Sequence, residues 1–113
     1  MDRSTPIKLI RRTYGVDELL QPVPVETSRT VFAAVRSISR AEFVAAGQMG
    51  LTPTWQLTMF APDYELEDLV AFTPPGSDTE ERYSVYRTYR GRNEELELYL
   101  ERQVGREGVR ASE

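Results

Sequence analysis

A strict alternation of apolar and polar residues in two segments constrains the fold of this chain more than any other feature. In Thr54–Ala61 (TWQLTMFA) large apolar residues alternate with polar ones, and in Glu95–Glu101 (ELELYLE) leucines alternate with glutamates. A side-chain period of two is that of a half-buried β-strand, whereas an amphipathic helix needs apolar residues three and four positions apart. Propensity alone would allow a helix in the Glu/Leu segment. Its alternation and the turn residues of Arg90–Asn93 before it favour a strand in a hairpin.

Four other segments also have the pattern of strands, and in chain order they are Ile7–Tyr14, Arg29–Ser39, Leu66–Phe72 and Arg82–Tyr89. Arg29–Ser39 is apolar on both faces, which predicts a strand covered on both sides for part of its length. A helix is the competing interpretation of Glu65–Phe72, but turn residues on either side favour a strand. Gly15–Pro24 is expected to be a connection, because its two prolines cannot donate to a central ladder.

A short helix is predicted between the second and third strands. Ser39 and Glu42 have the spacing of a capping box, in which the serine hydroxyl accepts from the Glu42 N–H and the glutamate reaches back to the Ser39 N–H. Ile38 and Phe43 lie where a hydrophobic staple would place them. The sequence therefore predicts a helix near residues 40–49 whose entry is fixed by Ser39 and Glu42 and which is held down by Phe43.

The predicted helix has a defined end. Gly47 and Gly50 are candidate stop residues, and Pro53 cannot continue a helix. We therefore expect a mainly β protein, a small antiparallel barrel or sandwich of about six strands with one short inserted helix. Residues 1–104 would form this single domain, and the polar residues 105–113 would form a flexible tail.

Composition narrows the function classes. The chain has 113 residues, no cysteine, no histidine and a net charge of −4. It therefore lacks thiolate chemistry, the commonest metal ligand and the commonest general base at neutral pH. Net acidity argues against a main task of gripping nucleic-acid phosphates. The N-terminus lacks the apolar run of a signal peptide, and no apolar stretch approaches the roughly 18 residues of a membrane span. We expect synthesis in the cytosol and no membrane partner.

Candidate catalytic and metal-binding groups have simpler interpretations. The carboxylates of Asp63, Glu65, Glu67 and Asp68 lack the glycine-anchored spacing of a calcium loop and are expected to face water. The carboxylates at positions 80, 81, 94, 95, 97 and 101 could be paired for acid–base work, but no apolar pocket is indicated to raise a pKa. The Gly47-x-x-Gly50 spacing is too short for a nucleotide-binding loop. The sequence thus predicts no catalytic residue, cofactor or metal, and a protein that is not an enzyme.

One binding function remains open from the residues alone. Tyr83, Tyr86 and Tyr89 alternate with Arg87 and other residues in one strand, a pattern that resembles a base-stacking platform on a barrel. Aromatic residues at period two are more often core residues and cross-strand pairs. A module that binds single-stranded nucleic acid is therefore the alternative function, and a host-directed interaction protein of barrel form is a third.

The order of several short motifs resembles that of the small head-closure, or head–tail joining, proteins of tailed bacteriophages (the stopper family). The matching residues, in chain order, are Val25-Glu26-Thr27, Val31-Phe32-Ala33, Val35-Arg36-Ser37-Ile38-Ser39-Arg40, Glu42-Phe43, Ala46-Gly47-Gln48-Met49-Gly50-Leu51, Phe60-Ala61, Asp63-Tyr64, Tyr83-Ser84-Val85-Tyr86-Arg87-Thr88-Tyr89 and Glu97-Leu98-Tyr99. They span residues 25–100, and the segment from Ala46 to Leu51 is the most recognisable. The loop Thr73–Glu81 departs from the family, since it is longer and richer in proline and glycine than the short turn expected there.

The resemblance implies a structural virion protein at the phage neck. Such a subunit self-associates into a ring between the portal-bound adaptor protein and a tail-side terminator or tube protein. The ring closes the exit channel after packaging, and the packaged DNA passes through or abuts it. The protein would then be found in the virion, at the head–tail connector, and in the host cytoplasm during assembly.

The inserted helix and the segment after it are the candidate contact element of this ring subunit. The candidate residues for contact with a partner or with the channel are Arg40, Phe43, Gln48, Met49 and Leu51, while Ser39 and Glu42 form the helix cap. Loops that reach neighbouring subunits are what a ring protein needs. Deletion of Gly47–Leu51 is expected to leave a folded monomer that fails to retain DNA or to recruit tails.

Overall fold

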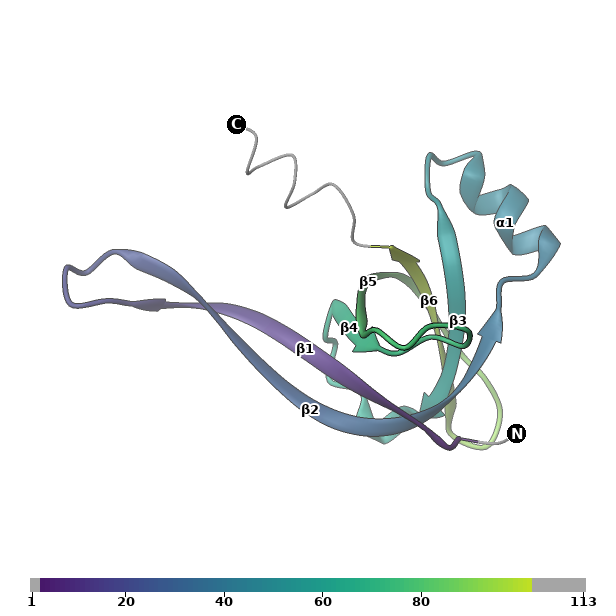
Figure 1. The fold of residues 1–113 in the computed structure, drawn as a ribbon, viewed down its shortest axis with the longest axis horizontal. Coiled ribbons are helices and arrows are strands. Elements are labelled where there is room, and N and C mark those ends of the chain that lie inside the picture. The colour runs from purple at the N-terminus through teal and green to yellow at the C-terminus, as the bar shows by residue number, and fades with distance from the viewer. Residues whose placement is uncertain (1–2, 103–113) are drawn as a thin grey trace.

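Six antiparallel strands close into one barrel in the computed structural model, which describes residues 3–102 (Figure 1). The elements are β1 (Thr5–Val16), β2 (Pro22–Ser37), α1 (Arg40–Gly47), β3 (Pro53–Phe60), the 3-10 turn η1 (Ala61–Asp63), β4 (Leu69–Phe72), β5 (Glu81–Arg90) and β6 (Glu95–Arg102). The strands follow one another around the barrel in the order β1-β2-β3-β6-β5-β4, and β4 pairs with β1 to close it. The predicted mainly β fold with one short helix is confirmed, and it is a barrel. The predicted tail lies outside the described residues.

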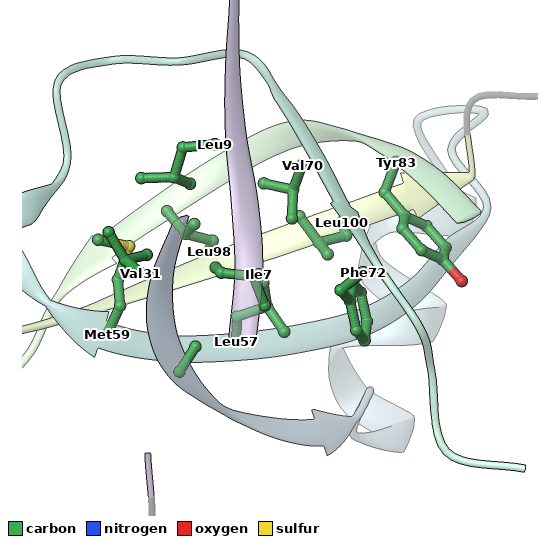
Figure 2. Close-up of a cluster of buried hydrophobic side chains, with 11 residues drawn as sticks. Ile7, Leu9, Val31, Leu57, Met59, Val70, Phe72, Tyr83, Leu98 and Leu100 are labelled. Atoms are coloured by element: carbon green, nitrogen blue, oxygen red, sulfur yellow. The ribbon is translucent and has the colours of Figure 1, made fainter. Parts of the chain in front are cut away.

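The barrel interior is filled by the alternating apolar residues that the sequence pattern identifies (Figure 2). The buried cluster consists of Ile7, Leu9, Val31, Ala33, Leu57, Met59, Val70, Phe72, Tyr83, Leu98 and Leu100. Every strand contributes to it, and each fully buried large side chain is worth about 1.5–3 kcal/mol. Phe72 packs against Tyr83 with ring centroids 5.2 Å apart and against Trp55 at 6.4 Å. These contacts position β5, which carries part of the candidate site.

The largest difference from the predicted fold is a long two-stranded arm. β1 and β2 pair continuously from Thr5↔Ala33 to Val16↔Pro22, and they extend well beyond the barrel (Figure 1). The prediction of a connection over Gly15–Pro24 is therefore wrong, because only residues 17–21 connect the strands. Two prolines are tolerated in β2 because they are two residues apart, so both lack the N–H of the same strand edge. The other edge stays free to pair with β1.

The fourth strand is shorter than predicted. It begins at Leu69 rather than Leu66, because residues 64–68 form a loop and not part of the strand. Leu66 has a φ of 67° and is exposed, while the carbonyl of Asp68 accepts a bond of 3.0 Å from the Val85 N–H. The predicted alignment of Leu66 with Val70 in one strand is thus wrong.

One predicted face is confirmed in part and another changes. On the outer face of β2, Phe32 is mostly exposed but Ala34 is buried, so β2 is covered on both sides for part of its length, as predicted. In β5, the pairing with β6 shifts between Val85 and Arg87, and Tyr86 is the extra residue of a β-bulge. The bulge breaks the period of two. Tyr83 therefore points into the core, while Tyr89, predicted to share its face, is 57% exposed.

Candidate interaction surfaces

Helix α1 begins with half of the predicted capping box. The Ser39 Oγ accepts a bond of 3.2 Å from the Glu42 N–H, and Ser39 has the extended backbone of an N-cap residue. The other half is wrong, because the Glu42 carboxylate turns to the barrel and not to the Ser39 N–H. The Tyr86 hydroxyl donates a hydrogen bond of 2.7 Å to one carboxylate oxygen of Glu42, and the Arg87 guanidinium lies 2.5 Å from the other. Glu42 therefore connects the helix to β5.

This connection depends on the bulge in β5, because the extra residue is Tyr86 itself. Arg87, the next residue, reaches the same carboxylate and also stacks on Tyr99 of β6, with its guanidinium carbon 4.1 Å from the ring centroid. Such a cation–π contact fixes the plane of the guanidinium. Tyr99 in turn donates to Glu97 over 2.6 Å. We call Glu42, Tyr86, Arg87 and Tyr99 the α1 clamp.

The clamp shifts the ionisation of its members in the direction expected for a charged network. The hydrogen bond from Arg87 is the main cause that lowers the pKa of Glu42, and the bond from Tyr86 adds to it. Burial, followed by the bond to Glu42, raises the pKa of Tyr86. Burial and the bond to Glu97 raise the pKa of Tyr99 to about 12. Glu42 is therefore a carboxylate and both tyrosines are neutral donors at physiological pH.

A Schellman motif ends the helix. The Leu51 N–H donates to the Ala46 carbonyl over 3.1 Å, and the Gly50 N–H donates to the Gly47 carbonyl over 3.0 Å. Gly50 has a φ of 82°, so it supplies the left-handed residue of this motif, whereas Gly47 remains in the helix. Between the helix end and β5 lies an open cavity of about 220 Å³ that Ala45, Ala46, Met49 and Leu51 line together with clamp residues.

The predicted contact residues do not all have equal access to solvent. Arg40, Gln48 and Met49 are exposed, and Leu51 is half-buried over the cavity. Phe43 is 57% exposed, so the expectation that it holds the helix down is wrong: the clamp has that role. Phe43 and Val44 of the helix and Met49 after it are exposed apolar residues, and we call these three residues the α1 face.

The end of the arm carries exposed apolar side chains that the sequence analysis missed. Tyr14 and Val16 lie on one face of the paired strands, Val25 lies on the other, and Leu19 and Leu20 lie in the turn; we call these five residues the arm tip. Asp17 organises the turn, because its Oδ1 accepts from the N–H groups of both Leu19 and Gln21 at 2.9 Å. Leu20 has a φ of 62° and is 81% exposed. An exposed leucine in the left-handed region costs free energy in the monomer, and Leu66 in the loop before β4 is a second one.

The base of the arm is fixed to the barrel by an ion pair between a partly exposed arginine and a buried glutamate. Glu67 is buried, and Arg29 of β2 reaches it at 3.0 Å. The Glu65 N–H also donates to Glu67 over 2.9 Å, and these bonds lower the pKa of Glu67 although burial opposes them. Arg29 and Arg11, one from each strand of the arm, also donate to the carbonyls of Asp63 and Glu65. The expectation that Glu67 faces water is therefore wrong, and the loop before β4 supports the arm.

The residues of the alternative nucleic-acid surface do not lie on one platform. Tyr83 is in the core, Tyr86 is bonded to Glu42, and Tyr89 is exposed further along β5. Arg87 is engaged in the clamp. Stacking of successive bases needs aromatic faces that lie open side by side, and these three rings do not provide them.

Within residues 3–102, no group of three or more acidic side chains converges as a metal site would require. Over the same residues, no helix has the length and apolar character needed to cross a membrane. Comparisons with protein-family models, curated proteins and solved structures give no match. The likeness to phage head-closure proteins stays a prediction that rests on the order of its short motifs.

Proposed function

We propose that this chain is a structural assembly subunit of the neck of a tailed bacteriophage, in the ring that joins the portal-bound adaptor to the tail and closes the DNA exit channel. The observation that carries the proposal is a closed barrel with two exposed apolar extensions, the arm tip and the α1 face. Large apolar side chains that gather at an exposed extension are typical of interaction sites. The order of motifs from Val25 to Tyr99 supplies the family.

The charge of the chain supports the same function. A net charge of −4 disfavours tight binding to duplex phosphates, which carry the same sign. A subunit beside a DNA channel benefits from this property, because the genome must leave without adhering to the wall. The neighbours in this proposal are the adaptor ring on the head side and a terminator or tube protein on the tail side.

Immunogold labelling of virions and of tail-less heads with an antibody to this chain tests the proposal. Label at the head–tail junction of both particles is expected. Label on the capsid or the tail tip, or particles without the protein, would contradict it.

A complementation experiment tests the role of the α1 face. Phe43→Ser and Met49→Ser alter exposed side chains, so the monomer should fold while DNA retention or tail joining fails. Deletion of Gly47–Leu51 is a poorer test, because it would remove the Schellman motif and shorten the link to β3. Leu66→Ser is the matched control, since Leu66 is 85% exposed but lies in the loop before β4. Full infectivity of both α1 variants would contradict a contact role of this face.

A further inference from the structure

The two apolar surfaces lie at opposite ends of the molecule. The arm tip and α1 mark the two ends of its longest axis, in a chain whose extents are 48 × 30 × 28 Å (Figure 1). The arm is also fixed at its base by the Arg29–Glu67 pair. The tip therefore cannot reach the helix of its own chain, and any contact between the two surfaces joins different copies.

The charges of the two surfaces are complementary. Between residues 13 and 25 the charged residues are Asp17 and Glu18, so the end of the arm is acidic. Glu26 lies nearer the barrel, opposite Arg12, and its charge is balanced by an ion pair with Arg82. Between residues 36 and 55 the only charged residues are Arg36, Arg40 and Glu42. Since Glu42 is paired with Arg87 in the clamp, Arg36 and Arg40 are the exposed charges that this segment itself contributes. The carboxylate of Glu101 lies at the far end of the segment, where it accepts from the Thr52 N–H. Opposite charges around apolar centres set the orientation and the rate of association.

A second exposed apolar surface, around Phe60 and Phe32 on the barrel, could also receive the arm tip, but the charge around it is negative like that of the tip. Phe60 is partly exposed on the barrel and follows Met59, which pairs with Ala33, so Phe32 is near it in the sheet. The residues close to Phe60 in the fold include Asp63, Glu94 and Glu95, whose carboxylates outnumber the guanidinium of Arg92. An acidic tip is repelled there.

Both surfaces are preorganised. Asp17 holds the tip turn with two backbone hydrogen bonds, and the clamp holds α1 against β5. A rigid surface loses little conformational entropy when it binds. Leu20 presents its side chain to solvent from a left-handed backbone, at a cost to the monomer.

We propose that the arm tip of one copy docks on the α1 face of the next copy, with Leu19 and Leu20 against Phe43, Val44 and Met49, and Glu18 beside Arg40. Two different surfaces at opposite ends make a heterologous, head-to-tail contact, which closes into a ring when the rotation between copies permits it. This inference gives the ring of the proposed function its contact and rests on that function for its biological setting.

Directed cross-linking tests the contact, and the chain suits it because it has no cysteine. Leu19→Cys protein is mixed with Val44→Cys protein under mild oxidation, and the covalent dimer is measured against time. We expect it to form at least tenfold faster than in the matched mixture of Leu19→Cys with Phe60→Cys. Equal rates would overturn the proposal. Preferential cross-linking at Phe60, or of Leu19→Cys with itself, would place another surface or a second tip in the contact and would also overturn it.

Charge reversal supplies a second readout that needs no cross-link. Glu18→Lys and Arg40→Glu should each weaken association at least fivefold at low salt in sedimentation velocity, and the chain with both changes should recover it. If the double variant does not regain association, Glu18 and Arg40 do not pair and the proposed contact is contradicted. The cross-link and the immunogold label separate the two proposals: a specific cross-link without neck label leaves the contact standing, and neck label without the cross-link leaves the function standing.

Discussion

Replacing Glu42 with glutamine should loosen α1 while the barrel stays folded. The hydrogen bond from Tyr86 to a carboxylate is worth about 1.5–3 kcal/mol. Arg87 is more than a third exposed, so its ion pair adds only about 0.5–1 kcal/mol. Glutamine keeps one acceptor oxygen and therefore part of the first bond. We expect a loss of about 1–2 kcal/mol for Glu42→Gln and about 2–4 kcal/mol for Glu42→Ala.

Hydrogen exchange measures this loss where it occurs. The amides of α1 should exchange about tenfold faster for each 1.4 kcal/mol, while the amides of β3 and β6 should change less. Glu97→Gln is the matched control, because Glu97 bonds Tyr99 of the clamp but does not touch the helix. A double-mutant cycle with Tyr86→Phe isolates the pair, and a coupling of at least about 1 kcal/mol is expected. Strict additivity of the two changes would refute the clamp.

The pH dependence of the clamp follows from the lowered pKa of Glu42. Its ordinary value is 4.5, and the folded state holds the carboxylate below that, mainly through the hydrogen bond from Arg87. The unfolded chain therefore binds the proton more readily, so the stabilisation is fully present above pH 4.5 and declines as the pH falls through the folded pKa. In Glu42→Gln protein this part of the acid sensitivity of α1 exchange should disappear.

Four further substitutions have defined outcomes. Arg29→Met should lower the free energy of unfolding by about 2 kcal/mol in urea, because it leaves the buried Glu67 carboxylate without its partner; an unchanged value would show that the pair does not support the arm. Gly50→Ala should cost about 1–2 kcal/mol in the left-handed region, whereas Gly47→Ala, inside the helix, should be neutral or stabilising. Leu20→Gly should raise the melting temperature of the monomer and weaken self-association, and a lower melting temperature would contradict backbone strain at the tip.

The strands of the barrel were predictable because their signal is local. Leu57, Met59, Leu98 and Leu100 alternate with polar residues, which predicts strands but leaves a barrel and a sandwich as alternatives. The pairing of β4 with β1 decides for the barrel. The α1 start was predictable for the same reason, since Ser39 caps a residue three positions on. The function of the Glu42 side chain was not, because its partners lie more than 40 residues away and depend on a bulge at Tyr86.

The arm was missed because its residues are typical of a turn in the sequence but pair as strands in the fold. Pro22 and Pro24 exclude a central strand, yet an arm outside the barrel has two free edges and can place both prolines on one of them. Turn residues flank a pair of leucines, and local rules interpret the whole segment as a connection. The pairing of Val16 with Pro22 shows that the strands continue to the turn. Such a register belongs to two paired strands, and a single sequence does not show it.

The same prolines bear on how the arm can meet a partner. A free strand edge is a template for pairing with another chain, and natural proteins protect such edges with proline and charge. Pro22 and Pro24 remove donors from the outer edge of β2, and Arg11, Arg12 and Glu26 add charge along the arm. Strand addition along the outer arm is thereby disfavoured, while the turn keeps its leucines exposed. The part of the arm that remains open to a partner is therefore the tip. Because the strand edges are protected and the turn is exposed, we expect the arm to contact another copy end-on.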